Sequence, residues 1–187
     1  MSTAPAVITA QIAEAAELSE DARALVTEHQ PPREYLEALR ALGHLEDAVR
    51  FLAYSLPKRE AVWWAWVCAR RSNGAEAAPP KIQAVLTATE KWISQPTDEN
   101  RRAVMPLAEA AGIGTAAGCA AMGAFFSGGS IAPPEAPAVP PAPQLTAKFV
   151  STSIVVSSVA TEPDKADEKL ATFLTQGLDV ATRIKLW

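Results

Sequence analysis

One stretch of this chain, LPKREAVWWAWVCARR at residues 56–71, carries three of the five tryptophans within four positions. On a helix, at about 100° per residue, these indoles spread over an arc of about 160°, and Ala, Val and Cys side chains fill most of the rest. A helix that is apolar nearly all round has to be buried. Each indole can bury about 150–250 Å². We therefore predict that this helix is the centre around which the fold closes.

Length and composition fit one domain with one sizeable core. A chain of 187 residues can bury roughly 70% of its unfolded surface, so it needs no disulfide or metal for stability. Cys68 and Cys119 lie in apolar, small-residue surroundings, which is typical of reduced, buried thiols. The N-terminal MSTAPAVITA lacks the basic segment of a signal peptide. We expect a cytoplasmic protein.

Apolar periodicity predicts helices along most of the chain. Residues 145–160 are rich in β-branched side chains but keep helical spacing, and we predict a helix because a lone strand would have no partner. The overall prediction is an all-α, single-domain orthogonal bundle of about eight helices over residues 1–187, built around the tryptophan helix. The other predicted helices are 7–17, 20–28, 33–42, 45–56, 80–95, 97–111 with a kink or break at Pro106, 115–126 and 164–184.

A segment without charge, residues 110–134, has two readings. Gly114 and Gly118 have the spacing of packed membrane helices, but the apolar residues around them are mostly Ala and Gly, and two prolines close the segment. The alternative is a buried helix whose small residues let a neighbour, such as the tryptophan helix, come close. We predict the buried helix and no membrane span.

Residues 127–145 are predicted to form a long loop within the domain. The SGGS turn is followed by IAPPEAPAVPPAP, which holds six of the fifteen prolines and should be extended in polyproline II fashion. The loop is either a simple linker, an exposed PxxP ligand, or a lariat across an aromatic groove. Its candidate contact residues are Pro134, Pro137 and Pro140.

The sequence offers little for catalysis or for nucleic acid. No nucleophile, phosphate-loop or metal motif is present, and neither His29 nor His44 has a ligand at metal-binding spacing, so we predict no catalytic residue, metal or cofactor. Net charge is −4 with scattered basic residues, which argues against nucleic acid. The alternative is an enzyme acting on a small molecule, in a pocket between the tryptophan helix and helix 115–126. Glu60 is then the candidate carboxylate.

The residues left over point to recognition of another protein. Lys58 and Arg59 lie in the first turn of the tryptophan helix, where the helix dipole disfavours a cation by about 0.3–1 kcal/mol. They are either solvated or part of a binding edge. The terminal Trp187 is either frayed or docked. Tryptophan is common at docking surfaces, and the predicted contact residues on the helical part are Lys58, Arg59, Trp63, Trp64, Trp66 and Trp92.

Four segments read in order carry a resemblance that covers nearly the whole chain: LPKREAVWWAWVCARR, KWISQP, FFSGGSIAPPEAPAVPP and GLDVATRIKLW. The chain resembles an uncharacterised family of bacterial proteins associated with gene neighbourhoods of type VI secretion and related contractile injection machinery. The resemblance implies an accessory protein, such as an adaptor or chaperone that helps to load an effector. Its partner would be a secretion-system component or an effector. The resemblance implies no catalytic residue.

Overall fold

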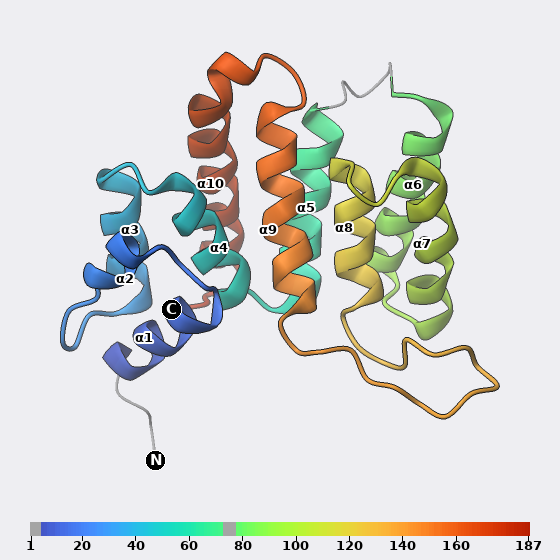
Figure 1. Ribbon diagram of the computed structural model, residues 1–187, viewed down its shortest axis with the longest axis horizontal. Coiled ribbons are helices and arrows are strands. Elements are labelled where there is room, and N and C mark those ends of the chain that lie inside the picture. The colour runs from blue at the N-terminus through green and yellow to red at the C-terminus, as the bar shows by residue number, and fades with distance from the viewer. Residues whose placement is uncertain (1–4, 73–77) are drawn as a thin grey trace.

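The computed structural model describes residues 5–72 and 78–187, and the described chain is helical throughout, with no strand (Figure 1). The all-α, single-domain bundle is confirmed, with ten α-helices in the described residues rather than about eight, and the longer helices run alongside one another in Figure 1. The elements are α1 (Pro5–Ala15), α2 (Glu20–Ala24), α3 (Pro32–Ala41), α4 (Leu45–Ser55), α5 (Lys58–Ser72), α6 (Pro80–Ser94), α7 (Asp98–Ala111), α8 (Ala116–Phe125), α9 (Leu145–Val159), the 3-10 helix η1 (Pro163–Lys165) and α10 (Ala166–Arg183).

The tryptophan helix α5 is central, as predicted. It packs against α6, α8, α9 and α10, and α9 lies in front of it in the view of Figure 1. The Trp64 indole N–H donates a hydrogen bond to the Phe173 carbonyl of α10, 2.8 Å away. The Trp66 indole N–H donates to the Leu86 carbonyl of α6 at 2.9 Å. Two buried indoles therefore fasten α5 to neighbours that lie far from it in sequence.

The charge-free segment forms α8, and every residue of this helix is buried. Its small residues allow close packing: a Cβ added at Gly123 would lie 3.3 Å from Cγ2 of Val62 in α5. The predicted buried helix that approaches the tryptophan helix is confirmed. None of the helices in residues 5–72 and 78–187 combines the length and the apolar character that a membrane crossing needs.

Two helices differ most from the prediction, α2 in its end and α7 in its continuity. Helix α2 ends at Ala24 rather than near residue 28, because the chain turns there: the Gln30 side chain accepts a hydrogen bond from the Thr27 N–H, and His29 has a φ of +66°. Helix α7 continues through Pro106 without a break. Val104 and Ala108, on either side of the proline, are fully buried, so packing holds the helix together despite the lost backbone hydrogen bond.

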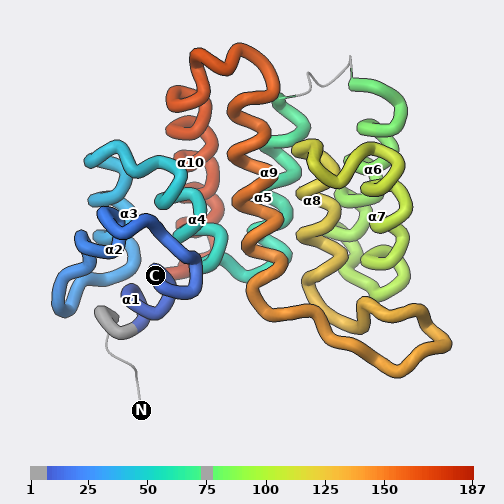
Figure 2. The backbone as a smooth tube through the Cα atoms, viewed as in Figure 1, coloured from blue at the N-terminus to red at the C-terminus, as the bar shows by residue number. Residues whose placement is uncertain are grey.

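The α8–α9 loop runs out from the bundle and returns to it (Figure 2). Two arginines of α7 hold its base: Arg101 donates to the Ser130 carbonyl at 2.8 Å, and Arg102 donates to the Ala132 carbonyl at 2.9 Å. A hydrogen bond of 2.9 Å from the Ile131 N–H to the Val139 carbonyl closes the loop on itself. The loop is therefore fixed at its base, while residues 133–140 are exposed.

Candidate functional site

Three of the four tryptophans predicted to contact a partner are core residues. Trp64, Trp66 and Trp92 are only 0%, 8% and 4% exposed. The N–H groups of Trp64 and Trp66 are already bonded to carbonyls inside the protein. This corrects the predicted contact surface, because an apolar helix at the centre of a bundle gives its large side chains to the core.

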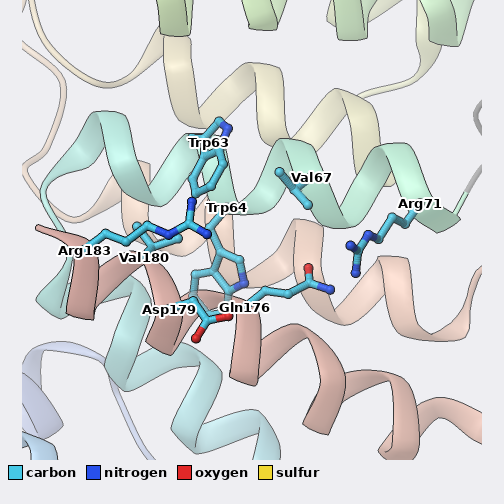
Figure 3. Close-up of a pocket in the computed structure, with 8 residues that line it drawn as sticks. All are labelled: Trp63, Trp64, Val67, Arg71, Gln176, Asp179, Val180 and Arg183. Atoms are coloured by element: carbon cyan, nitrogen blue, oxygen red, sulfur yellow. The ribbon is translucent and has the colours of Figure 1, made fainter.

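Trp63 is the tryptophan of α5 that reaches the surface, where it is partly exposed. It lies where two depressions meet. One, of about 290 Å³, lies between α5 and α10 and is drawn in Figure 3. The other, also about 290 Å³, lies between α5 and α6. The first is lined by Trp63, Trp64, Val67, Arg71, Gln176, Asp179, Val180 and Arg183, and the second by Arg59, Glu60, Trp63 and Ile93.

A third depression, of about 440 Å³, adjoins the second at Arg59 and extends to the base of the α8–α9 loop. Its walls include Lys58, the start of α7 at Thr97 and Asp98, and the main chain of residues 127–129. Neighbouring depressions share a lining residue: Trp63 lines both the first and the second, and Arg59 lines both the second and the third. We call this continuous surface the α5 face.

Lys58 and Arg59 are exposed, and each is bonded to a main-chain carbonyl of another element. Lys58 donates to the Ser127 carbonyl at 2.9 Å, and Arg59 donates through Nε to the Ile93 carbonyl at 2.7 Å. Within the described residues, neither cation has a carboxylate within 4.0 Å. Both side chains are thus positioned by the fold while their charges stay unpaired.

Asp98 is the acid that lines the third depression, and its carboxylate is bonded to two arginines of α7. Arg101 donates to its Oδ1 from Nε at 2.9 Å and from Nη2 at 2.7 Å, and Arg102 donates to Oδ2 at 2.8 Å. These hydrogen bonds, from Arg101 first and then Arg102, lower the pKa of the Asp98 carboxyl. Asp98 therefore belongs to the arginine cluster at the loop base and does not neutralise Lys58 or Arg59.

Glu60 does not lie between α5 and α8, where the enzyme alternative predicted its pocket. Glu60 is partly buried and lines the depression between α5 and α6. Between α5 and α8, Val62 approaches Gly123 so closely that an added Cβ would be 3.3 Å from it. In residues 5–72 and 78–187, no three side chains of the Asp, Glu, His and Cys types come together as a metal site would need.

The loop prolines stay apart from the α5 face. Pro134, Pro137 and Pro140 are exposed on the α8–α9 loop, and none of them lines the three depressions. Only the glycine-containing base of the loop, at residues 127–129, contributes to the α5 face. The two groups of predicted contact residues are therefore separate surfaces.

Sequence reasoning missed the α10 side of the α5 face. Gln176, Asp179, Val180 and Arg183 line the first depression and follow the spacing i, i+3, i+4, i+7 of one helix face. That mixed polar pattern could have marked α10 as part of a surface facing a partner. In Figure 3 the Arg183 side chain extends from α10 toward the Trp63 indole.

Comparison with protein-family models identifies the family of this chain. Residues 35–181 match the model of a family described as a family of unknown function, DUF6931. The chain belongs to this family. Membership of DUF6931 confirms the predicted resemblance to an uncharacterised family, and the match includes all of α5 and the loop base but stops before Arg183. No curated protein and no solved structure matches the chain.

Proposed function

We propose that this DUF6931 protein is a non-catalytic accessory protein that binds another protein through the α5 face. The observation that carries the proposal is the placement of Trp63. The other two tryptophans of α5, Trp64 and Trp66, are buried in the core, whereas Trp63 lines two depressions at the surface. A large aromatic side chain set between recesses, with charges around it, is the arrangement of an interface hot spot.

The partner supported by the sequence resemblance is a component or effector of a bacterial secretion system. An adaptor or chaperone for effector loading needs a binding surface and no catalytic group. The α5 face supplies such a surface on a helix that packs against α6, α8, α9 and α10, so the contact residues are held by a rigid support.

The test measures binding of the purified chain to each protein encoded beside its gene, by isothermal titration calorimetry. Changing Trp63 to Ala should weaken the binding of the true partner by about 30-fold or more, since truncating a hot-spot tryptophan costs about 2 kcal/mol or more. The matched control is Trp187→Ala, because Trp187 is also a surface tryptophan, 38% exposed, and lies outside the α5 face. It should leave binding unchanged.

A partner that binds the wild type and the Trp63→Ala variant equally well contradicts this use of the α5 face. Circular dichroism and thermal unfolding of both variants show whether the fold is kept. Binding that is lost instead when Pro134, Pro137 and Pro140 are changed to Ala would move the interface to the α8–α9 loop, where these exposed prolines remain the second predicted contact group.

A further inference from the structure

The two cations at the start of α5 are placed against the electrostatics of their own helix. The first turn of a helix carries partial positive charge, which disfavours a cation there by about 0.3–1 kcal/mol. Lys58 and Arg59 nevertheless occupy this turn and are held in place by carbonyls of residues 127 and 93. Around them, four cations (Lys58, Arg59, Arg101, Arg102) face two acids (Glu60, Asp98), a local charge of plus two on a chain with a net charge of −4.

Arg59 is held at Nε, which leaves the end of its guanidinium available to a ligand. Its Nε is used by the bond to the Ile93 carbonyl, and neither Nη has a hydrogen-bond partner in the described chain. A guanidinium fixed at Nε keeps two parallel N–H donors, which match the two oxygens of a carboxylate. Because Arg59 and Trp63 are four residues apart, they lie on the same side of α5, about one turn from each other.

The loop base keeps this part of the α5 face open. The N–H groups of Gly128 and Gly129 have no hydrogen-bond partner among the described residues. Gly129 has a φ of +63°, and a Cβ there would lie 2.8 Å from Oδ1 of Asp98 and 2.9 Å from Nη2 of Arg101, so a side chain would clash. Main chain with free donors, rather than side chains, therefore lines this wall of the third depression.

We propose that the segment bound on the α5 face is an acidic stretch of the partner protein. An Asp or Glu carboxylate binds to Arg59 and Lys58, and an adjacent apolar side chain packs against Trp63 and Ile93. This inference rests on the proposed function and specifies the chemistry of the partner. It follows from charge complementarity, since the unpaired cations supply what a carboxylate needs and the neighbouring indole supplies an apolar contact.

The test uses random twelve-residue peptides displayed on phage and selected on the immobilised full chain. Peptides with an acid next to a large apolar residue should be enriched, and synthetic versions should bind with an affinity that falls as NaCl rises from about 50 to about 500 mM. In the double variant Lys58→Glu, Arg59→Glu, their affinity should fall by about tenfold or more. Arg59→Lys keeps the charge but loses the fork, so it should give a smaller loss.

The matched control is Arg33→Glu. Arg33 is also an exposed arginine in the first turn of a helix, α3, and it lines none of the three depressions. The change reverses one charge at a helix start, where the double variant reverses two. It should leave peptide affinity within about twofold. Thermal unfolding of each variant reports whether the fold survives. The introduced glutamates should stabilise the first turn of the helix, because acids are favoured there by the helix dipole.

Four results overturn the inference. Peptides that depend on Trp63 but show no preference for acids, or that bind the double variant normally, would reject the acidic partner and leave the proposed protein-binding face standing. No enrichment at all would reject the acidic segment, while the proposed function keeps its own test with whole proteins. Equal competition by a single-stranded DNA of 20 nucleotides, an anion without apolar side chains, would show that the face responds to charge alone.

Discussion

Helices α5 and α8 look alike in sequence and are used differently. Both have apolar or small residues around nearly the whole circumference, yet all ten residues of α8 are buried, whereas α5 leaves Trp63 and Val67 partly exposed and its ends charged. The difference lies in residue size. Alanines and glycines let α5, α6, α7 and α9 close around α8. The indoles of α5 are too large for that, and depressions remain on both sides of Trp63, toward α10 and toward α6.

An all-apolar helix therefore needs small residues, of its own or on its neighbours, to be enclosed completely. Trp64 is enclosed because α10 has a glycine where the ring lies: a Cβ at Gly177 would be 2.6 Å from Cε2 of Trp64. None of the glycines in residues 5–72 and 78–187 lies against Trp63 in this way, and its indole shares the surface with Arg59 and Arg183. The same residue type thus serves the core at one position and the surface at the next.

The largest expected effect separates the two sides of α5. Trp64→Ala should lower the free energy of unfolding by about 3–5 kcal/mol, since it leaves a large cavity and removes the donor to the Phe173 carbonyl. Trp63→Ala should cost less, about 1–3 kcal/mol, because the indole packs against the core but part of its surface already meets solvent. Urea unfolding followed by circular dichroism measures both, and equal costs would show that Trp63 is as much a core residue as Trp64.

The sequence predicts which helices are buried, but not which side chain of a buried helix stays exposed. The centrality of α5 and the burial of α8 follow from composition around the helix, which any enclosing set of neighbours satisfies. The exposure of Trp63 could not be predicted, because it depends on residues of α6 and α10 that approach from more than 20 positions away. The continuity of α7 at Pro106 likewise depends on the burial of Val104 and Ala108, which a local rule for proline does not include.

The next effect tests the close packing of α8. Gly118→Ala should destabilise the fold by about 1–3 kcal/mol, because the new Cβ would lie 2.2 Å from the Gly112 carbonyl oxygen, which is main chain and cannot turn aside. Gly123→Ala should cost less, since its nearest neighbour is a methyl group of Val62 at 3.3 Å. Thermal unfolding compares the two. A neutral Gly118→Ala, or a costlier Gly123→Ala, would place the tightest contact of α8 elsewhere.

The smallest effect uses the one cysteine in each helix, Cys68 in α5 and Cys119 in α8. Burial raises the pKa of both thiols, that of Cys68 well above its usual range. The unfolded chain therefore releases these protons above a pH of about 8.5, while the folded chain keeps them. The contribution of the two thiols to the free energy of unfolding is complete below that pH and is lost as the pH rises. Each thiol contributes a slope of at most about 1.4 kcal/mol per pH unit.

Urea unfolding between about pH 8 and pH 9.5 should show a flatter decline of the unfolding free energy in Cys68→Ala than in the wild type, and flatter still when Cys119 is also Ala. Parallel curves for the wild type and Cys68→Ala would mean that the Cys68 thiol ionises in the folded protein, and that α5 is enclosed less completely than predicted even on its inner side.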